Sequence, residues 1–199
     1  MSNSYHFVTR WRVKARAEEV YDIISQPLDY PRWWPAVYLE VREGAGRRFQ
    51  VHSKGWLPYT LRWEFGTAEA ISPRRIVIEV AGDFDGRGVW SFTQDGEHLD
   101  ITFDWTVTAN KPMLRYLSPV LRPAFEANHR WAMAQGEICL RQELIRYRAR
   151  TPEELLEAAD PRGPVEVPTR WIAAGALAAS AIACIALARR KSRKSQVVA

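Results

Sequence analysis

The chain has 199 residues, of which 47% are hydrophobic and 12% aromatic, and it carries 28 Lys and Arg against 23 Asp and Glu. Residues 1–150 are long enough for one domain with a real core. Six of the basic residues follow position 169, where no acidic residue occurs, so 22 basic and 23 acidic residues remain upstream. The excess positive charge therefore belongs to the C-terminal end, and the domain lacks the basic surface that nucleic-acid binding requires.

The first half of the chain begins with an alternating apolar and polar pattern. Residues 6–13 predict a half-buried strand, with Phe7, Trp11 and Val13 on one side. A helix is expected over residues 17–25, because Val20, Ile23 and Ile24 share one face. Residues 26–35 contain three prolines and predict a turn with a short helical piece.

Six further strands are expected in succession, followed by one long helix. The predicted strands are 38–41, 49–54, 60–70, 76–80, 88–92 and 99–107, with turn residues at 44–46, 72–75 and 95–97. The period then changes, and Ser118-Pro119 is expected to open a helix that runs to Arg150. This order predicts an α+β domain in which a curved antiparallel sheet packs on one amphipathic helix.

The residues after 150 predict a connection to a membrane. Thr151 and Pro152 favour a short acidic helix, and residues 151–168 end in a proline-rich linker. Residues 169–188 contain an uncharged run, Trp171 to Ala188, which as a helix spans about 27 Å. The basic tail 189–199 follows, with Arg and Lys where membrane anchors place them. We therefore expect one transmembrane helix.

An alternative is that this segment is an Ala-rich helix packed on the domain, because nine of its eighteen residues are alanine. Gly175, Ala179 and Ala183 have the spacing of small residues that permits weak self-association of spanning helices. The basic tail favours a cytoplasmic C-terminus, whereas the absence of a signal-peptide pattern at the N-terminus favours a cytoplasmic domain. We expect the domain in the cytoplasm, held as a single-pass membrane protein by its C-terminal helix.

At this level of organisation the chain resembles a known superfamily. Residues 13–21 (VKARAEEVY), 29–35 (DYPRWWP), 86–92 (GRGVWSF) and 128–137 (NHRWAMAQGE) are similar to segments of START-like (SRPBCC) proteins. The similarity covers residues 4–148 and implies the helix-grip fold. The superfamily includes polyketide cyclases and dehydrases, aromatases and lipid-transfer proteins, so the resemblance predicts fold more firmly than function.

In the helix-grip fold the cavity lies between the sheet and the long helix, and inward strand residues line it. The candidate ligand-binding residues are Trp11, Ser53, Trp63, Trp90, Phe103, Trp105, His129 and Met133. These residues form a mostly apolar wall with few polar groups, which is typical of a hydrophobic ligand site. The alternative is that the aromatic residues simply fill the core. Ala132 and Gly136 favour open volume, because small side chains leave room.

His129 is the candidate catalytic residue, because it projects from the apolar face of the predicted long helix. An imidazole there can exchange a proton with a ligand, position it, or serve only as a hydrogen-bonded core residue. Asp83, Asp85 and Arg87 are expected to form a polar hairpin, either at the cavity entrance or as a solvated turn. Trp33 and Trp34 either wall the entrance, touch lipid or pack the short helix.

No metal or cofactor is expected, since the four histidines have no ligand spacing and no phosphate or dinucleotide motif occurs. Two functions remain open. The first is binding or transfer of a hydrophobic small molecule, such as a lipid, isoprenoid or polyketide, by a membrane-tethered domain. The second is a polyketide cyclase or dehydrase that acts by acid–base catalysis on such a ligand.

Overall fold

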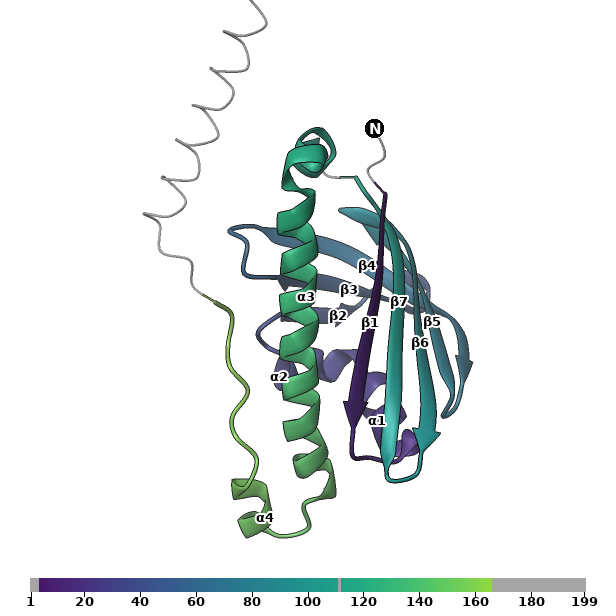
Figure 1. Ribbon diagram of the computed structural model, residues 1–199, viewed down its shortest axis with the longest axis vertical. Coiled ribbons are helices and arrows are strands. Elements are labelled where there is room, and N and C mark those ends of the chain that lie inside the picture. The colour runs from purple at the N-terminus through teal and green to yellow at the C-terminus, as the bar shows by residue number, and fades with distance from the viewer. Residues whose placement is uncertain (1–3, 111, 166–199) are drawn as a thin grey trace, which may run out of the picture. The chain divides into compact units, whose positions relative to one another are not determined.

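The protein folds as one curved sheet crossed by one long helix, as the computed structural model of residues 4–110 and 112–165 shows (Figure 1). The sheet has seven antiparallel strands in the order β1-β7-β6-β5-β4-β3-β2. The strands are β1 (Ser4–Val13), β2 (Tyr38–Glu43), β3 (Arg48–Lys54), β4 (Thr60–Ile71), β5 (Arg75–Gly82), β6 (Phe84–Asp95) and β7 (His98–Ala109). The expected α+β, helix-grip architecture is confirmed for these residues.

The helices are few, and the long one lies across a single face of the sheet (Figure 1). They are α1 (Ala17–Ile24), α2 (Tyr30–Trp33), α3 (Pro112–Arg148) and α4 (Pro152–Leu156), with short 3₁₀ turns η1 (Pro27–Asp29) and η2 (Ala45–Arg47). α1 and α2 lie beside the C-terminal half of α3. The short helices thus close one end of the space between the sheet and α3.

One sequence prediction about these elements was wrong. Helix α3 begins at Pro112, six residues before the expected Ser118, and continues through Pro119 and Pro123. Because proline lacks the backbone N–H that forms hydrogen bonds within a helix, the prediction placed Pro119 in the first turn and therefore put the start of the helix too late. Asp83 lies at the turn of the hairpin between β5 and β6, as expected, and Asp85 and Arg87 follow in β6, where they pair with Thr108 and Thr106; none of the three lines the cavity described below.

Alternation along β7 builds the core of the sheet. Leu99, Ile101 and Phe103 are buried, while the residues between them are partly exposed. β7 pairs with β1 on one side and β6 on the other over nearly its whole length. Because both neighbours follow the same two-residue period, their apolar side chains point to the face covered by α3.

Trp33 and Trp34 are buried, with 1% and 3% of their surface exposed. Neither indole is at the surface, so Trp33 packs α2 in the core, while Trp34 both packs α2 and lines the cavity described below. Trp34 lies against α3 at Gly136, where an added Cβ would come within 2.3 Å of the indole ring. Gly136 was expected to leave open volume, but the indole of Trp34 fills that volume.

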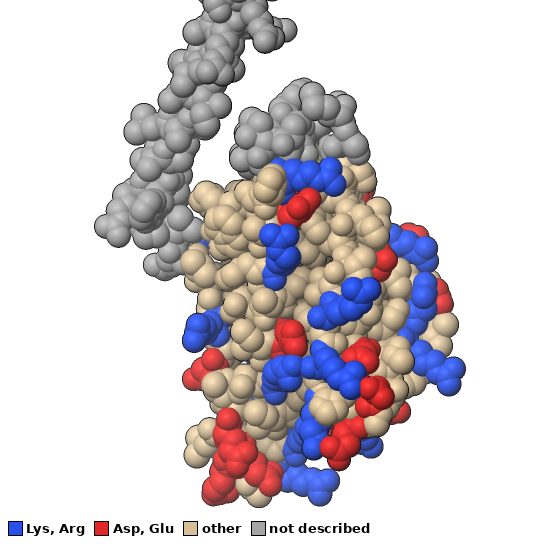
Figure 2. Space-filling model, in the orientation of Figure 1, with Lys and Arg blue, Asp and Glu red and all other residues tan. Residues whose placement is uncertain are grey.

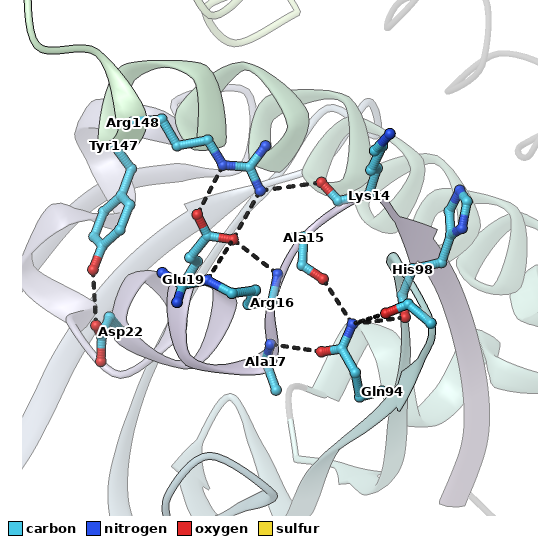
Figure 3. Close-up of polar contacts among 11 residues, drawn as sticks. Lys14, Ala15, Arg16, Ala17, Glu19, Asp22, Gln94, His98, Tyr147 and Arg148 are labelled. Carbon is cyan, nitrogen blue, oxygen red and sulfur yellow. Dashed lines mark hydrogen bonds and ion pairs between the residues drawn. The ribbon is translucent and has the colours of Figure 1, made fainter.

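Polar contacts fix the C-terminal end of α3 to α1 (Figure 3). Arg148 donates from Nε and Nη2 to the two carboxylate oxygens of Glu19, both at 2.8 Å. The backbone N–H of Arg16 donates to the same carboxylate. Arg148 and the other donor hold the pKa of buried Glu19 at about 2, below its usual 4.5, against the effect of burial.

Gln94 of β6 connects the same region to the sheet (Figure 3). Its amide oxygen accepts from the N–H of Ala17, while its amide nitrogen donates to the carbonyls of Ala15 and His98.

A carboxylate on α3 in turn holds α2. Glu143, five residues before Arg148, is buried and accepts two hydrogen bonds from Arg32 of α2. Both α1 and α2 are therefore held to α3 by carboxylate–guanidinium pairs.

The residues after α3 return along the domain. Thr151 caps α4, as predicted, by accepting from the N–H of Glu154. The N–H of Ala159 then donates to Gln142 of α3, and Lys54 Nζ donates to the carbonyl of Val165 at 2.9 Å. Figure 2 shows Lys and Arg interspersed with Asp and Glu on the face that carries α3, with acidic side chains gathered where α4 lies.

Among residues 4–110 and 112–165, no helix is both long and apolar enough to cross a membrane. The predicted span 169–188 and the basic tail 189–199 lie outside these residues, so both remain predictions. Cys139 is a buried free thiol.

Candidate ligand cavity

A cavity of about 290 Å³ lies between the concave face of the sheet and α3. This volume is at the lower edge of the range for small-molecule sites. Strands β3 to β7 supply most of the wall, α1 and α2 supply one end, and α3 contributes Phe125, Asn128, His129, Ala132 and Met133. The domain is therefore not a fully packed scaffold, although many of its aromatic residues are core residues as well.

Aromatic rings form a closed circuit of contacts around this space. Neighbouring ring centroids are 4.2–6.4 Å apart in the order Trp34, Tyr38, Trp63, Phe84, Trp105, Phe103, Trp90, Trp11 and back to Trp34. All of these except Trp11 line the cavity. Such contacts add about 0.5–1.5 kcal/mol each beyond area burial, so they hold the wall rigid.

The structure brings together seven of the eight residues predicted to contact a ligand. Ser53, Trp63, Trp90, Phe103, Trp105, His129 and Met133 all line the cavity. Trp11 does not, because it packs behind the wall against Trp34 and Trp90, at 5.8 and 5.3 Å. Alternation along a strand predicts which residues point inward, but not which of them another side chain will cover.

The polar groups in the cavity wall differ in whether they have a hydrogen-bond partner among the described residues. Trp63 Nε1–H donates to Ser53 Oγ at 2.8 Å. The indole nitrogens of Trp34 and Trp105 are buried and have no hydrogen-bond partner in the described part of the chain. Burial raises the pKa of Tyr38 and Tyr59 well above the usual 10, so both remain neutral.

His129 of α3 lines the cavity and faces residues of β1 and β7. Its ring stacks on Phe7, with centroids 4.1 Å apart, and lies 5.3 Å from the ring of Trp105. Its Nε2 is 3.4 Å from Thr9 Oγ1, a long hydrogen bond. Burial, with a smaller contribution from Arg130, lowers the pKa of His129 to about 4. The imidazole is therefore neutral near pH 7 and can accept a proton or share a hydrogen bond.

Several wall residues were not predicted from the sequence. Tyr38, Tyr59 and Phe84 lie near strand ends, where alternation is weak. Trp34, for which a wall position was one of the expected roles, lines the cavity as well. Asn128 also lines the cavity, and it accepts from the N–H of Leu57 at 3.2 Å. The aromatic content of these segments was the only available signal.

Asn128 also fixes the loop between β3 and β4 over one end of the cavity. Gly55 lies so close to it that an added Cβ would be 2.1 Å from Asn128 Oδ1. Lys54, Gly55 and Tyr59 line the cavity at this end, while Trp56 is partly exposed, with 36% of its surface accessible. This loop is therefore a rim of the cavity, and it is held by Asn128 together with the ring contact between Tyr59 and Phe125.

The described residues contain no group of three or more His, Cys, Asp or Glu side chains that could hold a metal ion. Asp and Glu are also missing from the described lining of the cavity. The chemistry available in this wall is therefore that of a neutral imidazole, hydroxyl groups, amide groups and indole N–H donors, together with Lys54 at the rim.

Comparison with known proteins assigns the family. The sequence profile described as polyketide cyclase / dehydrase and lipid transport matches residues 5–144. The chain belongs to this family. Among curated proteins, none matches the sequence.

Solved structures of other proteins show the same fold. TTHA0849 from Thermus thermophilus is 18% identical, with a TM-score of 0.56 over 73% of this chain and 100% of that one. The Zhui aromatase/cyclase from Streptomyces sp. R1128 is 18% identical, with a TM-score of 0.54 over 74% and 97%. A conserved protein from Geobacillus kaustophilus is 11% identical, with a TM-score of 0.57 over 71% and 96%. At these identities the likeness supports the fold alone.

The role of His129 can be tested with His129→Gln, which keeps polarity but cannot titrate near neutral pH. Folding lowers the pKa of His129 from 6.5 to about 4, so the unfolded chain binds the proton first. The native protein should therefore lose stability as pH falls from 6.5 to 4, by about 2 kcal/mol from this residue. In His129→Gln, the part of the stability loss that comes from protonation of His129 should be missing. Urea unfolding at pH 7.5 and 4.5 measures it, with His52→Gln on β3 as the control.

At pH 7.5 the same variant should lose about 1 kcal/mol, because the stacking on Phe7 is removed. Equal pH dependence in the two proteins would contradict burial of a neutral imidazole at this position. If His129 is a catalytic acid or base, turnover should fall by about 10²–10⁴.

Proposed function

We propose that this protein binds a hydrophobic small molecule, such as a lipid, isoprenoid or polyketide, while its C-terminal segment tethers it to a membrane. The observation that carries the proposal is the cavity between the sheet and α3, whose wall is mostly aromatic and aliphatic, with a few neutral polar groups and Lys54 at the rim. Such a wall favours transfer of apolar surface out of water. A tether would keep the cavity near membrane-soluble ligands and raise their effective concentration.

Membership of a family that includes lipid transport and cyclases supports the ligand class. The tether is supported by the sequence of residues 169–199 alone, and a cytoplasmic domain is part of the same proposal. A cyclase or dehydrase remains the second candidate function. It is favoured by His129, which lines the cavity as a neutral imidazole and can accept a proton from a bound substrate.

Filling the cavity tests the binding function directly. Ala132 lines the cavity from α3, so Ala132→Trp should occupy it and reduce bound ligand by about 100-fold or more. Ala134 is two residues away on the same helix and exposed, so Ala134→Trp is the matched control and should bind normally. Mass spectrometry of small molecules that co-purify with the full-length protein measures both. Equal ligand content in the two variants, both folded, would refute binding in this cavity.

A further inference from the structure

The loop between β3 and β4 exposes a tryptophan at the rim of the cavity. We call residues 55–59 the rim loop, because Gly55 and Tyr59 at its two ends line the cavity. Between them, Trp56 is 36% exposed and Pro58 is exposed as well. Tryptophan is enriched where one side of a surface is apolar and the other is wet, and the interface of a lipid bilayer is such a place.

The charge around the rim loop also fits a lipid surface. Lys54 comes directly before the loop, and residues 54–63 contain no acidic residue. Among the described residues Lys54 has no carboxylate partner, and its Nζ donates to the backbone carbonyl of Val165 at 2.9 Å. An ammonium group has three donors, so two remain for the anionic head groups of lipids.

Acidic residues gather at a different end of the domain. Glu153 and Glu154 lie in α4, where Figure 2 shows a group of acidic side chains. Asn128, which accepts from the rim loop at Leu57, lies 20 residues before Arg148 at the end of α3. These 20 residues span about 30 Å of helix, so the rim loop is far from the acidic end. An anionic bilayer would attract the rim loop and repel the end that carries α4.

The chain between α4 and Val165 runs back along α3 (Figure 1). The N–H of Ala159 donates to Gln142 of α3 at 2.8 Å, and six residues later Val165 accepts from Lys54. Six extended residues span about 20 Å, and the 14 residues of α3 between Asn128 and Gln142 span about 21 Å, so the two paths match in length. The described chain therefore ends beside the rim loop and away from the acidic end.

The position of Val165 limits where a membrane can lie. The uncharged run that is predicted to enter the membrane begins at Trp171, six residues further along the chain. Six residues span about 20 Å at most, so a bilayer that holds this run cannot be far from Val165 and the rim loop.

We infer that the rim loop is a membrane-contact surface, in which Trp56 enters the interfacial layer of the bilayer and Lys54 pairs with anionic head groups. Residues 157–165, held along α3, keep this surface toward the lipid. The inference rests on the membrane tether of the proposed function and adds the face of the domain that meets the bilayer.

Photocross-linking tests this contact in the full-length protein. In one variant p-benzoylphenylalanine replaces Trp56, and in the matched control it replaces Leu156 of α4, which is 84% exposed. Each protein is reconstituted in vesicles of phosphatidylcholine and phosphatidylglycerol, irradiated, digested and measured by mass spectrometry. A lipid adduct is expected on the peptide with position 56 and none on the peptide with position 156. The same replacement at Pro58 should also give the adduct, which covers the case that the first variant does not fold.

Flotation of the same vesicles separates failure of the inference from failure of the tether. Protein that floats with the vesicles but forms no lipid adduct in the rim loop, or forms equal adducts at position 156, overturns the inference while the tether stands. Cross-links from the rim loop to a second copy of the chain in place of lipid overturn it as well. Protein that does not float refutes the tether, and the inference fails with it.

Discussion

Removing residues 169–199 is expected to move the protein completely from the membrane fraction to the soluble fraction. The expected reason is that Trp171 to Ala188 is the only long uncharged segment of the sequence. The fold should survive, because residues up to Val165 form their own compact unit. Ultracentrifugation after carbonate washing measures the partition, and circular dichroism checks the fold.

A shorter deletion provides the control. Removing residues 189–199 takes away only the basic tail, so this variant should remain in the membrane fraction, bound less tightly to anionic lipid. Full-length protein that stays in solution without detergent would contradict the tether. That result would not argue against the ligand cavity, because the residues that line the cavity lie between positions 5 and 133.

Replacing Arg148 with methionine should lower the free energy of unfolding by about 2–3 kcal/mol. The change leaves Glu19, which is 7% exposed, with the backbone N–H of Arg16 and a loose ion pair to the exposed Arg16 side chain at 3.9 Å, but without its hydrogen-bonded guanidinium. Loss of one partner of a buried pair costs about 3–5 kcal/mol, and Arg148 is 43% exposed, so solvent screening reduces the effect. Urea unfolding at pH 7 measures it.

The same pair predicts an acid dependence of stability. The pKa of Glu19 is about 2 in the folded chain and 4.5 in the unfolded chain, so its contribution is complete above pH 4.5 and disappears as pH falls to 2. In Arg148→Met the pKa of Glu19 should rise, and this source of acid sensitivity between pH 4.5 and 2 should vanish. Arg12→Met is the control, because Arg12 pairs with Asp95 and Asp100 at the surface, and it should change stability little.

The fold could be predicted because its elements have clear periods. Leu99, Ile101 and Phe103 alternate with polar residues, and β7 occupies the expected position with two more residues at its C-terminal end. His129 was predicted in the cavity from its position on the apolar face of the long helix, and it lies there. Its function remains a prediction, as does ligand contact by the other wall residues.

Other features could not be predicted because they depend on contacts between distant residues. The hydrogen bond from the N–H of Leu57 to Asn128 joins positions 71 residues apart, so no local sequence pattern predicts it. Trp11 was assigned to the wall because its strand alternates, yet Trp34 and Trp90 cover it. The start of α3 was misplaced because local rules treat proline as a boundary, whereas the helix continues past Pro119.

The contact between Trp34 and Gly136 also fixes the register of α3. A shift of the helix by one residue in either direction would place the side chain of Gln135 or Glu137 where the indole now lies against the backbone of Gly136. The helix therefore cannot slide or rotate over the sheet by small steps to adjust the space beneath it. A ligand of different size must therefore be accommodated by movement of other parts of the wall, such as the loop between β3 and β4 that Asn128 holds at one end of the cavity.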